Sequence, residues 1–156
     1  MVAMFLPSSV LPRSPMKSKL PFTVLALAWL SFASAALAQN PPPLPAGVVA
    51  HRDLAYVTGG HAQQKLDLFV PEKTAAAPMP VIVWIHGGAW VSGDKSDNPP
   101  LRSGFVQRGY AVASLNYRLS GVALFPAQIE DCKAALRWLR AHAKEYNLDP
   151  GHIGVW

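Results

Sequence analysis

The sequence has few cysteines and no clustered metal-binding residues. Cys132 is the only cysteine among 156 residues, so no intrachain disulfide can form. It occupies an apolar position of a predicted helix, where cysteine usually acts as a small hydrophobic residue, and it is therefore a poor candidate nucleophile. The histidines are scattered, without ligand-like spacing to one another or to carboxylates, at positions 51, 61, 86, 142 and 152. We therefore predict no metal site and expect no cofactor.

A long hydrophobic run is also lacking. The apolar stretch at residues 22–37 is shorter than the ~20 residues that a membrane-spanning helix needs. Lys17 and Lys19 precede it, and Ala36-Leu37-Ala38 ends it with the small-x-small pattern of a signal-peptidase site. Residues 1–38 are thus predicted to be a secretory signal peptide, with Met16 as an alternative start. Cleavage would leave a secreted or periplasmic protein without stable membrane insertion, whereas an uncleaved anchor is the rival interpretation.

Positive charge is concentrated in this predicted leader. Three of the 14 basic residues and none of the 9 acidic residues lie within residues 1–38, so the remainder carries 11 basic against 9 acidic residues, a net charge of +2. A nucleic-acid-binding domain normally has a marked basic excess. We therefore expect no nucleic-acid partner.

The most informative stretch is residues 81–90, Val-Ile-Val-Trp-Ile-His-Gly-Gly-Ala-Trp. Its first five residues are apolar and β-prone, which predicts a strand buried on both faces, as in a parallel sheet. Gly87 and Gly88 follow, and adjacent glycines permit a tight turn or a close approach to the backbone. Such a turn can aim successive N–H groups at one point, as an oxyanion hole for acyl transfer requires. A tight turn with no further role is the simpler alternative.

His86-Gly87-Gly88-Ala89-Trp90 resembles the HGGG-type oxyanion motif of the α/β-hydrolase superfamily. The resemblance is to the secreted esterase and lipase branch related to hormone-sensitive lipase and to feruloyl or acetyl xylan esterases. Further matches follow in the same order: Gly93-Asp94-Lys95, Asn116-Tyr117-Arg118-Leu119, and Phe125-Pro126 before a helix that carries Asp131. They extend from about residue 50 to residue 156 and correspond to the N-terminal half of such a domain.

The resemblance implies that the N–H groups of Gly87, Gly88 and Ala89 form the oxyanion hole. Ala89 replaces the third glycine of the motif, and its N–H can serve if its φ is negative. His86 is expected to support the loop through hydrogen bonds rather than to act as a catalytic base. Trp90 is expected either to line the cleft that binds the acyl group of a substrate or to pack in the core. Tyr117 and Arg118 lie where the next strand ends, a position that allows a role in the site, although Arg118 is more simply interpreted as a donor that braces the glycine loop.

The predicted fold class is α/β, with a mostly parallel sheet and an antiparallel opening hairpin. Residues 39–47 form a proline-rich linker, and residues 48–156 form a partial α/β-hydrolase domain. The predicted elements are strands at 48–57, 64–70, 81–85, 110–117 and 152–156, a short helix at 101–108 closed by Gly109, and a long helix at 126–146. We expect the second strand to have one face in solvent. The last strand would be buried in the full sheet, but without its later partner it should present an unpaired apolar edge. The long helix should pack through an apolar stripe and keep Asp131 on a solvated face, the stripe being Ile129, Cys132, Leu136, Leu139, Ala143 and Tyr146.

The sequence lacks a Gly-x-Ser-x-Gly motif. In the family the last predicted strand leads into this nucleophile elbow, which would place the serine about three residues past Trp156. The resemblance thus implies a fragment of a carboxylic-ester hydrolase, truncated before the triad and inactive alone. The full-length parent would act on a small-molecule or polysaccharide-linked ester. The alternatives are a non-catalytic secreted binding protein or pseudogene product with the same fold, and a peptidase of the same superfamily.

Overall fold

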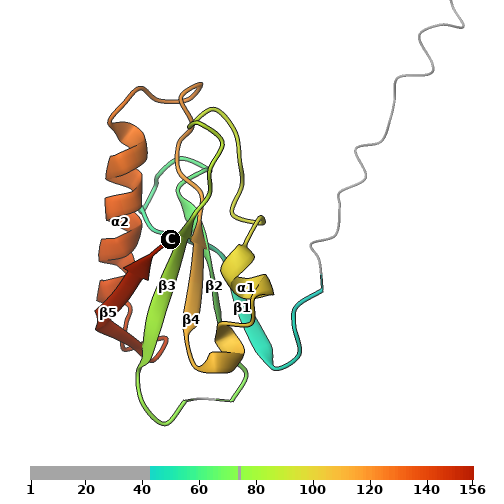
Figure 1. The fold of residues 1–156 in the computed structure, drawn as a ribbon. Helices are drawn as coiled ribbons and strands as arrows, with labels where there is room; N and C mark the ends of the chain where they lie inside the picture. The colour runs from blue at the N-terminus through green and yellow to red at the C-terminus, as the bar shows by residue number, and fades with distance from the viewer. Residues whose placement is uncertain (1–42, 74) are drawn as a thin grey trace, which may run out of the picture. The chain divides into compact units, whose positions relative to one another are not determined.

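The strands of the described chain form a single mixed sheet. The computed structural model describes residues 43–73 and 75–156, so the predicted signal peptide and residues 39–42 of the predicted linker lie outside the described residues. The sheet has the order β1-β2-β4-β3-β5 (Figure 1). Its strands are β1 (Val48–Ala55), β2 (Lys65–Pro71), β3 (Met79–Ile85), β4 (Ala111–Leu115) and β5 (Leu148–Val155).

The pairing of these strands confirms the predicted fold class. β1 pairs antiparallel with β2, and β2 with β4, which gives the expected opening hairpin. β3 runs parallel to β4 on one side and to β5 on the other. The apolar residues of β4 are all buried, as a central strand requires.

The helices lie on opposite faces of the sheet, α2 (Ala127–Ala141) on one and α1 (Pro99–Arg102) with the 3₁₀ turn η1 (Val106–Arg108) on the other (Figure 1). The single short helix predicted at 101–108 is thus split in two. Gly104, between the two pieces, has a φ of 73°, and a right-handed helix cannot continue through a residue with a positive φ. Gly109 closes η1 with a φ of 90°, as expected of a C-terminal glycine. No helix in the described ranges is both long and apolar enough to cross a bilayer.

The long helix differs from its prediction in two respects. It ends at Ala141 instead of residue 146, with His142 as its C-cap, and residues 142–147 form turns. Asn147 then leads the chain into β5 with a φ of 53°, and its side-chain amide donates to the carbonyls of Ala75 and Ala77. The buried face of the helix is also rotated by about one residue from the predicted stripe. Ile129 is 41% exposed, and the buried positions are Gln128, Asp131, Ala135 and Leu139.

The two cores explain the burial of the strands. One core lies under α2 and contains Leu66, Leu68, Val81, Val83, Ala113, Leu115, Ala135 and Leu139. A smaller one lies under α1 and η1 and contains Phe69, Val106 and Val112. Because both faces of β2 are covered, the prediction that one face of β2 lies in solvent is wrong.

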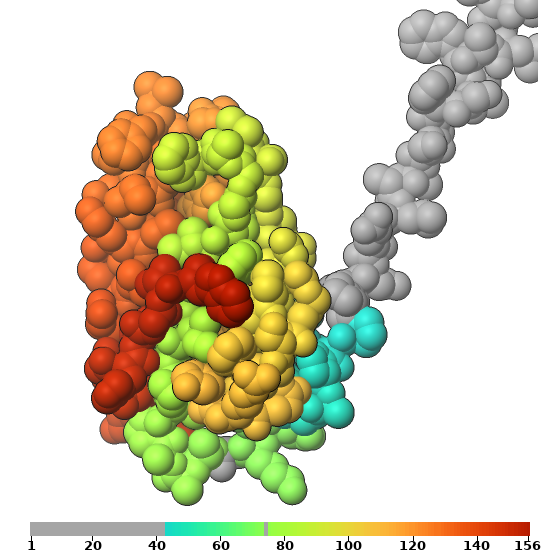
Figure 2. Space-filling model, viewed as in Figure 1, coloured from blue at the N-terminus to red at the C-terminus, as the bar shows by residue number. Residues whose placement is uncertain are grey.

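The strands at the β5 end of the sheet differ in burial. In β3 only alternate residues are fully buried, while Ile82 and Trp84 are half-buried. β5 is mostly exposed because it forms an edge of the sheet, and Figure 2 shows it at the surface. The prediction that β3 is buried on both faces is therefore only half right, whereas β5 forms the unpaired edge that was expected in the absence of a later strand.

Candidate functional site

The glycine loop, residues 86–90, begins where β3 ends. Ile85 pairs with Leu115, the last residue of β4, so the loop and residues 116–118 leave the same edge of the sheet. Trp156 lies beside them, because its N–H donates to Val83 O at 2.8 Å and its carbonyl accepts from Ile85 N–H at 3.0 Å (Figure 1). Ligands of open α/β sheets bind at the carboxyl ends of strands.

The loop is a run of left-handed residues. φ is 111° at Gly88, 51° at Ala89 and 62° at Trp90. This curl brings the N–H groups of Val91 and Ser92 onto the carbonyl of Gly88, at 3.0 and 3.1 Å. A Cβ at residue 88 would clash with the carbonyl of Ser92, so glycine is needed there for space as well as for φ. The negative φ set as a condition for Ala89 is not met, because the turn that wraps the Gly88 carbonyl needs a left-handed residue at 89.

Several adjacent N–H groups of the loop, among them the three predicted to form the oxyanion hole, have no internal partner. Within residues 43–73 and 75–156, the N–H groups of Gly87, Gly88 and Ala89 donate to no backbone carbonyl. All three residues are exposed, so these N–H groups lie open to solvent at the end of the strand and are accessible to a ligand.

Ala89→Gly is expected to stabilise the folded chain. A left-handed conformation costs an L-residue about 1–2 kcal/mol and costs glycine nothing, although the greater freedom of glycine when unfolded offsets part of the gain. We expect the free energy of unfolding to rise by about 0.5–1 kcal/mol in urea titrations. A fall in stability would show that Ala89 does not hold this φ in solution.

His86 is locked against the base of the loop. Its buried ring stacks on Tyr117 with centroids 4.4 Å apart, and Tyr117 Oη donates to the His86 carbonyl at 2.8 Å. His86 Nδ1 lies 2.8 Å from Gly87 O, and since a carbonyl can only accept, Nδ1 carries the proton. Gly93 contacts the same ring, and a Cβ there would clash with Nδ1. The ring therefore fixes the Gly87 peptide, a contact expected of a loop support.

Arg118 does not brace the glycine loop through its hydrogen bonds. Its backbone N–H, Nε and Nη2 all donate to Asp131, at 3.0, 2.9 and 2.8 Å. Gln64 Nε2 adds a further bond to the same carboxylate. Asp131 is 2% exposed, so its predicted place on a solvated face is wrong. Burial alone would raise the pKa of Asp131, but the bonds from Arg118 and Gln64 outweigh it and lower that pKa below its usual value.

A cavity of about 340 Å³ adjoins the loop. Trp90, Tyr117 and Ile129 supply much of its apolar wall, so Trp90 lines a space next to the free amides instead of packing in the core. Cys132 also borders it, but burial raises the pKa of its thiol to about 11, which disfavours the thiolate that a nucleophile needs.

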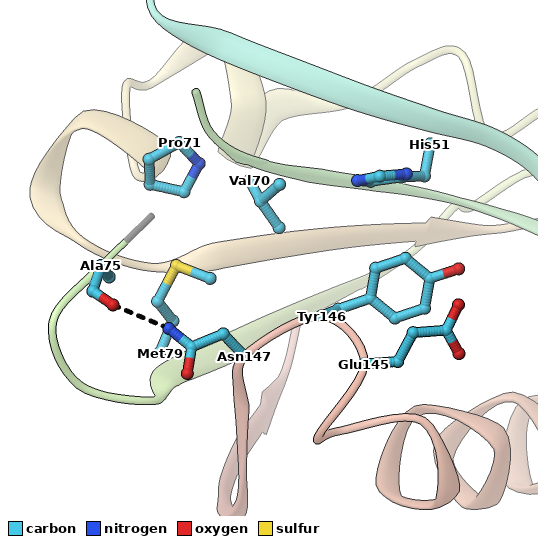
Figure 3. Close-up of a pocket in the computed structure, with 8 residues that line it drawn as sticks. All are labelled: His51, Val70, Pro71, Ala75, Met79, Glu145, Tyr146 and Asn147. Carbon is cyan, nitrogen blue, oxygen red and sulfur yellow. Dashed lines mark hydrogen bonds between the residues drawn. The ribbon is translucent and has the colours of Figure 1, made fainter. Parts of the chain in front are cut away.

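Another cavity, of about 370 Å³, lies near the opposite end of β3 (Figure 3). His51, Met79 and Tyr146 line it, with the His51 and Tyr146 rings packed edge to face at 4.9 Å. None of the glycine-loop residues reaches this cavity, so it has no part in the candidate site.

The motif Gly93-Asp94-Lys95 has a structural role that the sequence did not reveal. Asn116 accepts from Lys95 N–H at 2.6 Å and donates to Asp94 at 2.7 Å, which ties the motif to the end of β4. Lys95 Nζ reaches the buried Asp67 of β2 at 2.7 Å. The polar-apolar alternation of β2 placed Asp67 on a solvent face, and its ion pair with Lys95, which the sequence does not show, explains its burial. In the described part of the chain no three His, Cys, Asp or Glu side chains gather as metal ligands, and the expectation of no metal stays a prediction.

Residues 66–156, more than half of the sequence, match the family model BD-FAE. The chain belongs to the BD-FAE family. It is 36% identical over 105 residues to a probable carboxylic ester hydrolase, LipM, of Mycobacterium tuberculosis, an alignment that covers 66% of this chain and 24% of LipM. This confirms the predicted α/β-hydrolase esterase family.

Solved structures agree with this assignment. Esterase B from Lactobacillus rhamnosis is 33% identical with a TM-score of 0.60, over 72% of this chain and 37% of that one. A truncated carbohydrate esterase from gut microbiota is 32% identical with a TM-score of 0.60, over 69% of this chain and 38% of that one. The BD-FAE chain spans about a quarter of the length of the curated relatives it matches, 24% for LipM and 25% for esterase LipQ of the same organism.

Proposed function

We propose that this chain supplies the oxyanion-binding part of a serine-dependent carboxylic-ester hydrolase. The observation that carries the proposal is the set of unpaired N–H groups of Gly87, Gly88 and Ala89 at the end of β3. Preorganised donors of this kind stabilise the charge that develops on a carbonyl oxygen during acyl transfer. The ester-hydrolase relatives support the same chemistry.

The nucleophile would come from sequence beyond Trp156. Because Trp156 is hydrogen-bonded to Val83 and Ile85, residues that follow it would enter the space next to the glycine loop. A serine there would attack the ester carbonyl while a histidine takes its proton. The N–H groups of Gly88 and Ala89, with one from the residue after the serine, would then hold the tetrahedral oxyanion.

His86 and Tyr117 act as positioning residues in this proposal. The bond from His86 Nδ1 to Gly87 O turns that carbonyl toward the ring, and the bond from Tyr117 to the His86 carbonyl fixes the start of the loop. The cavity beside Trp90 would take an apolar part of the substrate. We further propose a small-molecule or polysaccharide-linked ester as substrate, and secretion or periplasmic export of the protein.

The 156-residue chain alone is expected to hydrolyse p-nitrophenyl acetate at the background rate. Loss of the triad removes about 10⁶-fold in kcat from a serine hydrolase. A chain extended by the codons downstream of Trp156 should hydrolyse the ester, and a dipeptide anilide assayed in parallel tests the peptidase alternative.

Each outcome of this assay bears on a different part of the proposal. Esterase activity in the 156-residue chain would contradict the assignment of the nucleophile to later sequence. An extended, folded chain that is inactive on all short acyl esters would overturn the ester-hydrolase proposal and favour a non-catalytic binding protein.

A further inference from the structure

The cavity of about 370 Å³ near the start of β3 is assembled from segments that lie far apart in the sequence. Its lining comes from β1, the end of β2, the segment that leads into β3 and the turn after α2, at His51, residues 70–71, Ala75 with Met79, and residues 145–147. None of these residues belongs to the glycine loop. A ligand bound here would therefore be distinct from the proposed ester substrate.

Interactions between these segments hold the walls of the cavity in place. Asn147 Nδ2 donates to Ala75 O at 2.9 Å, and Asn147 O accepts from Met79 N–H at 2.9 Å. On another side, the rings of His51 and Tyr146 pack edge to face with their centroids 4.9 Å apart. A cavity that is held open in this way binds a ligand without first having to order its own walls.

The lining has an apolar end and an acidic end. Figure 3 shows Met79 and Ala75 at one end and Glu145 beside Tyr146 at the other. Among the described residues that line the cavity, Glu145 is the one carboxylate and none is a lysine or an arginine. The side-chain amide of Asn147 is already bonded to two carbonyl groups, so it offers no free donor to an anion. The lining thus favours a positively charged ligand.

The carboxylate of Glu145 is both accessible and free of a cationic partner. Glu145 is exposed, and it belongs to none of the ion pairs of the described residues. Burial and the neighbouring Glu145 carboxylate raise the pKa of Tyr146, so the Tyr146 hydroxyl stays protonated and is a donor to that carboxylate. A carboxylate has about four acceptor positions, and those that remain can accept from an ammonium group.

We propose that this cavity binds a small primary amine with an apolar body. The ammonium group would donate to Glu145, and the body would lie against Val70 and Met79. The thioether of Met79 favours an aromatic body, because sulfur makes favourable contacts with aromatic rings. An anion would be repelled by Glu145, and a neutral molecule would leave that carboxylate without a partner. This binding site goes beyond the proposed ester hydrolysis and does not depend on it.

Titration of the purified chain with phenethylamine tests the proposal. We expect binding in the millimolar range in calorimetry, supplied mainly by burial of the aromatic body. NMR spectra should show nuclear Overhauser contacts between the ligand ring and the methyl group of Met79. Glu145→Gln keeps the shape of the side chain and removes its charge. Because the ion pair is partly exposed, the affinity of this variant should fall at least about threefold.

Matched controls separate this site from general charge effects. Glu130→Gln removes another exposed carboxylate, one that does not line the cavity, and should bind phenethylamine as the unchanged chain does. Phenethyl alcohol, which has the same body without the charge, should bind at least about threefold more weakly. Hydrocinnamate, which carries the opposite charge, should not bind.

Four results would overturn the proposal. They are no binding of phenethylamine, equal affinity of Glu145→Gln, equal binding of phenethyl alcohol, and contacts of the ligand that do not include the methyl group of Met79. None of these measurements depends on esterase activity, so a failure here is distinct from a failure of the proposed function.

Discussion

Asp131→Ala is expected to lower the free energy of unfolding by about 3 kcal/mol. The carboxylate is almost completely buried and accepts three bonds from Arg118 and one from Gln64. Removing it leaves the buried Gln64 amide and a partly covered guanidinium without their acceptor. Since Arg118 keeps some contact with water, we expect the lower end of the range observed for broken buried ion pairs, measured by urea unfolding.

Glu130→Ala provides the matched control for this prediction. Glu130 is the preceding residue of α2, is 53% exposed in its side chain, and makes one surface ion pair with Lys133. Its removal should change the free energy of unfolding by less than about 0.5 kcal/mol. Equal effects of the two substitutions would contradict the conclusion that the buried carboxylate of Asp131 stabilises the fold through Arg118 and Gln64.

Acid unfolding gives a second measurement on the same variant. The folded state lowers the pKa of Asp131, whereas the unfolded chain should have the ordinary value of about 3.9. The carboxylate therefore stabilises the fold above about pH 4, and this contribution is lost as the pH falls through the lower, native pKa. The stability of the unchanged chain should decline more steeply below pH 4 than that of Asp131→Ala. Asp94 also has a lowered pKa, since bonds from Asn116 and Ser96 outweigh its burial, but it affects both proteins equally.

The bonds of Asp131 with Arg118 and Gln64 also explain why the buried face of α2 could not be predicted from the sequence. Apolar periodicity predicted a stripe through Ile129 and Cys132, because a carboxylate at 131 reads as a solvated residue. The partners of Asp131 lie 13 and 67 residues away in the sequence, and no local pattern links them. A polar network that is fully satisfied can thus rotate a helix away from the face that its apolar residues indicate.

The strands and the glycine loop were predicted better from the sequence than the buried face of α2. The order and type of the strands follow from local runs of β-prone residues, and the motif at 86–90 identified the family. The φ of Ala89 was not predictable, because it depends on which carbonyl the loop encloses, here that of Gly88. The position of β5 at the edge was expected from the absence of a later partner strand, since an apolar sequence alone does not indicate whether its strand is central or at an edge.

Gly88→Ala should have the largest effect in the loop, a loss of about 2–3 kcal/mol in the free energy of unfolding. The residue holds a φ of 111°, and its Cβ would clash with the backbone carbonyl of Ser92, which cannot move without breaking the turn. Relief of the clash would rotate the peptides that carry the free N–H groups. The loss should appear in urea unfolding and in faster proteolysis of the loop.

Gly87→Ala is the control that makes this result specific. A Cβ at residue 87 meets no atom within 4 Å, and Gly87 is absent from the left-handed glycines, so alanine fits its backbone. We expect a change within about 0.5 kcal/mol. Comparison of Gly88→Ala with Gly87→Ala therefore tests whether the conformation at residue 88, and not the mere loss of a glycine, causes the loss of stability. Equal losses would mean that the carbonyl of Gly88 is not wrapped as described, and the N–H groups of Gly88 and Ala89, which are proposed to bind an oxyanion, would then have no fixed direction.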